Sequence, residues 1–153
     1  MLKIFILYIL CVISWTDMRE RVIKNNHLLF LLILSLLDII SEGDIRLADK
    51  IVGILIVSIP MLVITLFSNG GFGGGDIKLI AVCGFLLGKE RILRASWITL
   101  LLTAVYVLGY LSLTYIKAGS DRSFGRLKPE IRAEFPLGPF ICISVMAIFL
   151  EVL

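Results

Sequence analysis

The chain has 153 residues, a net charge of +3 and a hydrophobic fraction of 59%, and its mean hydropathy is +1.02. Soluble domains have roughly half of their residues apolar, so the composition argues against a soluble globular protein. The small positive charge is typical of basic loops beside anionic lipid and argues against a nucleic-acid-binding surface.

The apolar residues are gathered in six blocks along the chain, and each block is predicted to be a membrane helix. Helices are the expected spanning element because every backbone polar group needs a partner in lipid. The third, fifth and sixth blocks approach the length of about 20 residues that a span requires, and the others are shorter. The sequence therefore predicts an all-α, polytopic membrane protein in which residues 1–153 form one domain with six transmembrane helices. The blocks are 2–16, 27–40, 51–67, 77–88, 95–116 and 136–153.

The first block is interpreted as a helix that stays in the protein, since it lacks the small-residue cleavage site of a signal peptide. The three cysteines, Cys11, Cys83 and Cys142, lie far apart in apolar blocks without a C-x-x-C pair. They are expected to act as small hydrophobic residues. The single histidine, His27, is expected at a membrane boundary, so neither a metal nor a cofactor is predicted.

The loops between the blocks differ in basic charge, and this difference predicts the orientation. Nine Lys and Arg residues flank the first, third and fifth loops, against six on the opposite side. Basic loops favour the cytoplasm. Both termini are therefore predicted outside, and the long polar segment 117–135 is predicted to be a cytoplasmic loop, either as a mobile chain or with a surface helix near its end.

Two aspartates combine a membrane-edge position with the same predicted face. Asp17 ends the first block in "SWTDMRE", and Asp76 precedes the fourth in "GGGDIKL". Each also has a purely structural interpretation: Asp17 marks the point where a helix leaves the lipid, and Asp76 is a helix N-cap. Taken together, two carboxyls within hydrogen-bonding reach share one proton and can activate a water molecule for peptide hydrolysis.

A glycine-rich segment, "NGGFGGG", directly precedes Asp76. It fits neither a dinucleotide fingerprint nor a Walker motif. A backbone without side chains can lie beside an extended peptide, so Gly73, Gly74 and Gly75 are predicted to bind substrate or shape the site. Lys78 either contacts lipid phosphate or helps to shape the site. Farther along, the G-x-x-x-G spacing of Gly84 and Gly88 indicates close helix packing.

These features resemble the type IV prepilin peptidases, which are membrane aspartic proteases of the G-x-G-D class. Three segments carry the resemblance, in the family's order. They are "GGGDIKL" at 73–79, which matches G-x-G-D followed by a hydrophobic residue and K-L; Asp17 with Arg21, Ile23 and Asn25, which match the first-acid segment; and "FPLGPF" at 135–140, which matches F-P-x-G-P.

The resemblance implies a catalytic dyad of Asp17 and Asp76 without cofactor or metal. It also implies a bacterial cytoplasmic-membrane enzyme that removes a short basic leader from type IV pilin-like or pseudopilin precursors on the cytoplasmic side. Pro136, Gly138 and Pro139 are interpreted as scaffolding of the last helix. The oligomeric state is left open.

The chain departs from the family pattern in two places. Lys24 stands where the family has the proline of I-P-N. The paired C-x-x-C segment that the family links to methylation is absent, so a short form without methyltransferase activity is expected.

Two other function classes compete with this interpretation. Other G-x-G-D proteases, which resemble signal peptide peptidase or presenilin, carry Y-D and P-A-L motifs that this chain lacks. A small transporter or channel is the second alternative, but it would be expected to place its acids near the bilayer midplane.

Overall fold

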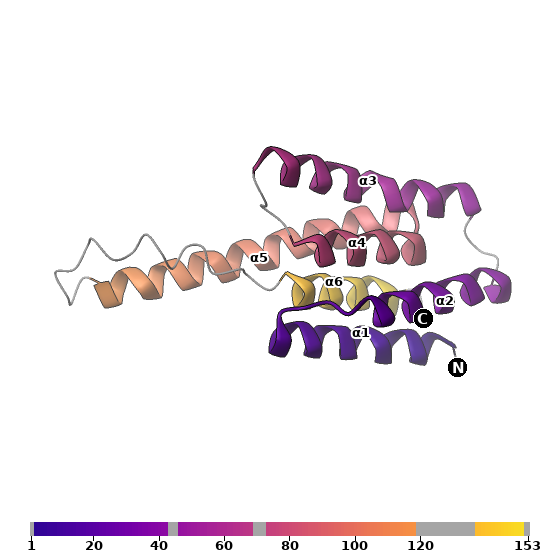
Figure 1. Ribbon diagram of the computed structural model, residues 1–153, viewed down its shortest axis with the longest axis horizontal. Helices are drawn as coiled ribbons and strands as arrows, with labels where there is room; N and C mark the ends of the chain where they lie inside the picture. The colour runs from indigo at the N-terminus through magenta and orange to yellow at the C-terminus, as the bar shows by residue number, and fades with distance from the viewer. Residues whose placement is uncertain (1, 43–45, 69–72, 119–136, 152–153) are drawn as a thin grey trace.

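The structure is a computed structural model that describes residues 2–42, 46–68, 73–118 and 137–151. Within these residues every regular element is an α-helix, which agrees with the predicted all-α class (Figure 1). The helices are α1 (Leu2–Glu20), α2 (Asn25–Glu42), α3 (Leu47–Phe67), α4 (Gly74–Leu87), α5 (Lys89–Ala118) and α6 (Gly138–Leu150).

The helices coincide with the six apolar blocks but differ in length. By length and composition, α3 and residues 89–113 of α5 could each cross a membrane. In contrast, α4 and α6 have 14 and 13 residues. At 1.5 Å per residue these helices are about 20 Å long, against a hydrocarbon core of about 30 Å. Two candidate spans are therefore supported, and six spans remain a prediction.

Successive helices run in alternating directions through the bundle. In Figure 1 the N and C termini lie together at one end. The last turn of α1 and the first turns of α4 and α6 lie at the opposite end. The bundle thus brings three segments that are distant in sequence to one end, which includes both candidate aspartates.

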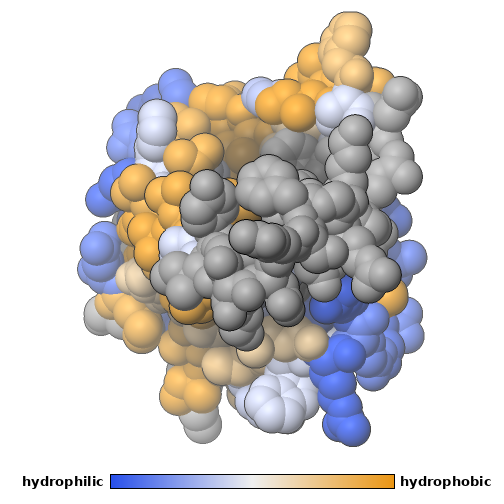
Figure 2. All heavy atoms as spheres, turned by 90° about the vertical axis from the view of Figure 1, so that its left-hand side faces the viewer, coloured by the Kyte–Doolittle hydropathy of each residue, from blue (hydrophilic) through white to orange (hydrophobic). Residues whose placement is uncertain are grey.

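The core is formed by apolar side chains from α1, α2, α4 and α6, with Ile92 and Ala95 from the start of α5. Members that are completely buried include Leu10, Leu31, Leu79 and Val145. Large apolar side chains also cover the outside of the bundle, and Figure 2 shows many of them around the end view. A surface of this kind is expected for helices that face lipid.

Helices α3 and α4 touch backbone to backbone at Gly53 and Gly84. A Cβ atom added at Gly84 would lie 2.7 Å from the carbonyl carbon of Gly53, and one added at Gly53 would lie 3.0 Å from the carbonyl carbon of Gly88. The close packing predicted for Gly84 and Gly88 is therefore present at Gly53. Gly88 also ends α4, with a positive φ of 76°.

A hydrogen bond and an aromatic ring contact join α5 to α6. The hydroxyls of Thr99 and Ser144 hydrogen-bond to each other, and Ser144 is completely buried. Nearer the start of α6, the rings of Tyr106 and Phe140 pack with their centroids 5.3 Å apart. These contacts fix α6 against the longest helix of the bundle.

A buried ion pair links the end of α2 to the start of α3. Lys50 Nζ lies 3.9 Å from Asp38 Oδ2, and only 3% of Lys50 is exposed. Asp38 follows the middle of α2, so the pair lies toward the end of the bundle opposite the candidate aspartates (Figure 1). Asp38 therefore has a structural role here.

We expect Asp38→Asn to lower the free energy of unfolding by about 2 kcal/mol, because it leaves the Lys50 ammonium buried without its charged partner. Thermal unfolding in detergent measures this. Glu151→Gln is the matched control, since Glu151 pairs with Arg94 at 3.9 Å on the exposed surface and such pairs contribute about 0–1 kcal/mol. Equal stability of the two variants would contradict the role given to Asp38.

Candidate active site

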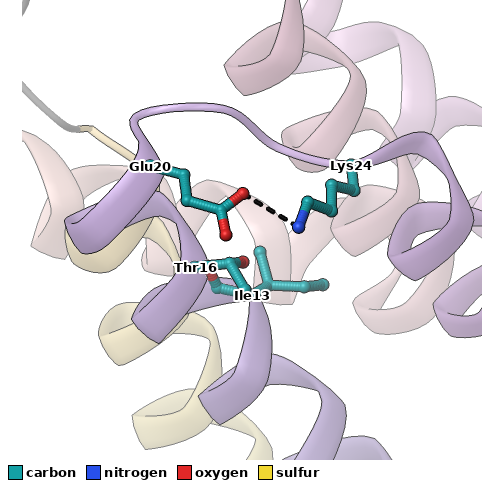
Figure 3. Close-up of polar contacts among 4 residues, drawn as sticks. All are labelled: Ile13, Thr16, Glu20 and Lys24. Carbon is teal, nitrogen blue, oxygen red and sulfur yellow. Dashed lines mark hydrogen bonds and ion pairs between the residues drawn. The ribbon is translucent and has the colours of Figure 1, made fainter.

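Asp17 lies in the last turn of α1, and only 5% of its surface is exposed. Helix α1 ends because Arg21 adopts a left-handed conformation with φ of 52°. Its amide still bonds to the Asp17 carbonyl oxygen at 2.9 Å. The chain then turns into α2, and the ion pair between Glu20 and Lys24, 2.8 Å long, spans this turn (Figure 3). The turn keeps Asp17 inside the bundle while its neighbours reach the surface.

Asp76 lies in the first turn of α4, as the third helical residue after the N-cap Gly73. The interpretation of Asp76 as the N-cap itself is therefore wrong. A Cβ added at Gly73 would lie 3.1 Å from Asp76 Oδ2, so the carboxyl folds back over the glycine. A negative charge in the first turn is favourable because the helix dipole is positive at that end.

The carboxyls of Asp17 and Asp76 are close enough for their charges to interact. The charge of Asp17 acts on Asp76, and both charges act on the Cys142 side chain. Cys142 is one turn into α6 and is completely buried, as is Cys83 of α4. Cys142 therefore lies near both acids in a buried part of the bundle, where electrostatic coupling is stronger than in water.

The other predicted site residues differ in what they contact. A Cβ added at Gly75 would lie 3.2 Å from Ile23 Cβ, whereas one added at Gly74 would meet no atom within 4 Å. Lys78 Nζ donates a hydrogen bond of 3.4 Å to Asn25 Oδ1 at the start of α2. The contact joins the N-terminal parts of α4 and α2, and both interpretations of Lys78 stay predictions. Residues 69–72 of the glycine-rich segment lie outside the described residues.

The motifs placed Gly138 near the site as scaffolding of the last helix, and the structure adds a direct contact between Gly138 and Asp17. Gly138 begins α6 and is buried against Asp17. A Cβ added at Gly138 would lie 2.8 Å from Asp17 Cγ. The F-P-x-G-P match pointed to this segment, but it gave no reason to connect Gly138 with the acid of α1. Pro136 and the predicted loop at 117–135 lie outside the described residues, except for the end of α5.

Metal ions in proteins are held by clusters of His, Cys, Asp or Glu side chains. No group of three or more His, Cys, Asp or Glu side chains there is arranged to hold a metal ion. His27 lies in the first turn of α2, and its Nδ1 atom is buried without a hydrogen-bond partner in the described residues.

Comparison with known proteins places this helical bundle in a class of peptidases. A family model described as the type IV leader peptidase family matches residues 4–109, which include both aspartates. The chain belongs to that family, which confirms the resemblance predicted from the motifs.

Among curated proteins, the chain is 35% identical over 99 residues to the prepilin leader peptidase/N-methyltransferase of Bacillus subtilis (strain 168). The alignment covers 64% of this chain and 40% of that relative, so the chain matches less than half of the relative's length. No solved structure matches.

Proposed function

We propose that this protein is a membrane aspartic endopeptidase that removes the leader from type IV pilin-like or pseudopilin precursors. The observation that supports the proposal is that Asp17, in the last turn of α1, and Asp76, in the first turn of α4, lie at the same end of the bundle. They are close enough there for the charge of Asp17 to act on Asp76. Membership of the type IV leader peptidase family supports the reaction class.

In the proposed reaction, one of the two carboxyls is ionised and the other is protonated. The carboxylate takes a proton from a water molecule, whose oxygen attacks the carbonyl carbon of the scissile peptide bond. The protonated carboxyl hydrogen-bonds to the carbonyl oxygen as negative charge develops there. When the intermediate collapses, the C–N bond breaks and the leaving amine takes a proton from the acid that first accepted it.

The direct test is cleavage of candidate precursors by the purified full chain in detergent or nanodiscs, with both products identified by mass. We expect one cut at the border between the leader and the apolar helix. The Bacillus subtilis relative serves as positive control. Failure to cleave any precursor that the relative cleaves under the same conditions would contradict the proposal.

The same measurement tests for methyl transfer. The relative's name includes an N-methyltransferase, but the chain aligns with only 40% of that protein. We propose cleavage without methylation, so the new amino terminus should have the unmodified mass when S-adenosylmethionine is supplied. A product heavier by a methyl group would contradict this part of the proposal.

The proposed location is the bacterial cytoplasmic membrane, with all six helices spanning and the aspartates at the cytoplasmic face. We expect a cysteine at Val22, beside the site, to react with an impermeant maleimide only in inverted vesicles. A cysteine at Glu90, at the other end of the bundle, should react only in intact cells. The native Cys83 and Cys142 are buried, whereas Cys11 is exposed and is replaced by serine in both labelling variants. The opposite pattern would reverse the orientation.

A further inference from the structure

The start of α6 makes direct contact with Asp17. The backbone of Gly138 packs directly against the Asp17 carboxyl, which makes its N–H the candidate donor to that group. The glycine also leaves the space into which that carboxyl fits, because a side chain there would overlap it. The buried Oδ2 atom of Asp17 has no hydrogen-bond partner in the described part of the chain.

We propose that Gly138 is a positioning residue that holds the Asp17 carboxyl in its reactive orientation, through its amide and through the absence of a side chain. The inference rests on the proposed protease function and adds a residue to it. Gly138 lies beyond the segment that the family model matches, 4–109.

The position of Gly138 in α6 suits this role. Amides in the first turn of a helix have no partner within the helix, so the Gly138 N–H is free to donate elsewhere. The positive end of the helix dipole also favours a carboxylate at this place. Helix α6 is itself fixed to α5 through Phe140 and Ser144. The donor is therefore carried by a rigid element.

The role predicts a specific consequence for the reaction. Oδ2 is the carboxyl oxygen buried against Gly138 on the α6 side, so we assign the water molecule of the proposed reaction to the other oxygen, Oδ1. If the support is lost, the carboxyl rotates or shifts, and the dyad loses its geometry although substrate can still bind. The chemical step should therefore suffer more than substrate affinity.

The first test compares Gly138→Ala with Gly109→Ala in the precursor-cleavage assay. A Cβ at Gly109, in the exposed part of α5, would meet no atom within 4 Å. We expect Gly138→Ala to lower kcat by about 100-fold, because a shift of about 1 Å at a reacting group can cost that much. KM should stay within about twofold, since the change acts on the chemical step. Gly109→Ala should match the wild type in both constants.

The second test removes the amide without adding a side chain. Glycolic acid introduced at position 138 replaces the N–H by an ester oxygen and keeps the space for Asp17. Loss of a hydrogen bond to a charged group should lower kcat by about tenfold. This variant decides the matter if Gly138→Ala does not fold, as judged by its thermal unfolding.

The outcomes separate this inference from the function on which it rests. If Asp17→Asn is inactive while the Gly138 variants keep wild-type kcat, the positioning role is wrong and the protease proposal stands. If Asp17→Asn itself cleaves normally, the proposed function fails. A rise in KM with unchanged kcat would also overturn the positioning role, because it would make Gly138 a substrate contact.

Discussion

Replacing either Asp17 or Asp76 by asparagine should lower kcat/KM for precursor cleavage by about 10³–10⁴-fold. Asparagine has nearly the same shape as aspartate but can neither accept nor deliver the proton that the reaction moves. General acid–base catalysis by one positioned group contributes about 10²–10⁴-fold, and both steps of the proposed reaction depend on the pair. Cleavage by purified variants, with products resolved by gel shift and by mass, measures the loss.

Asp38→Asn provides the matched control, since it removes a carboxylate from the other end of the bundle. It should keep most of the cleavage activity at temperatures where it remains folded, although it loses stability through Lys50. The double variant Asp17→Asn/Asp76→Asn should be no worse than either single variant, because the two acids act as one unit. Full processing by either single variant would falsify the dyad.

Gly84→Ala should be among the most damaging single methyl additions in the bundle, lowering the free energy of unfolding by about 2–3 kcal/mol. Its Cβ would enter the backbone of α3 at Gly53, where no flexible side chain can move aside. Unfolding in detergent, by heat or by added SDS, measures the change. Gly109→Ala is the control and should be neutral or gain up to about 1 kcal/mol, as alanine favours a helix over glycine.

A double variant tests whether the contact itself causes the loss. Once Gly84→Ala has pushed α3 and α4 apart, Gly53→Ala should cost less than it does alone. If the losses in free energy of unfolding were strictly additive, the two glycines would act independently. That result would contradict the role given to their backbone contact.

The sequence predicted the all-α class because each helix corresponds to one continuous apolar block, which can be recognised without knowing the rest of the fold. Boundaries were less accurate where glycine was involved. The fourth helix was predicted to begin at residue 77, after the glycine-rich segment, but Gly74 and Gly75 form the first turn of α4. Glycine permits a helix as well as a turn, and contacts with other segments decide between them. Gly75 is held at Ile23, a contact that no local pattern records.

The candidate acids could be selected from sequence because few carboxylates lie at the edges of apolar blocks. The residues that surround the two acids could not be identified from the sequence in the same way. The contact of Gly138 with Asp17 and the hydrogen bond from Lys78 to Asn25 join segments that are far apart along the chain. Such pairs depend on which helix faces pack together, and a single sequence does not contain that information.

The packing of the bundle places the two acids in different halves. Helix α1 packs mainly on α6 and α2, α4 packs mainly on α3 and α2, and α1 and α4 share little direct contact. Because the backbones of Gly53 and Gly84 touch, Asp76 is carried by a helix packed closely on α3, whereas Asp17 is carried by a helix packed on α6. In the proposed bilayer setting, the lateral pressure of the lipid would act on the helix packing that sets the distance between the two acids. Lipid composition should therefore change the cleavage rate without touching either carboxyl.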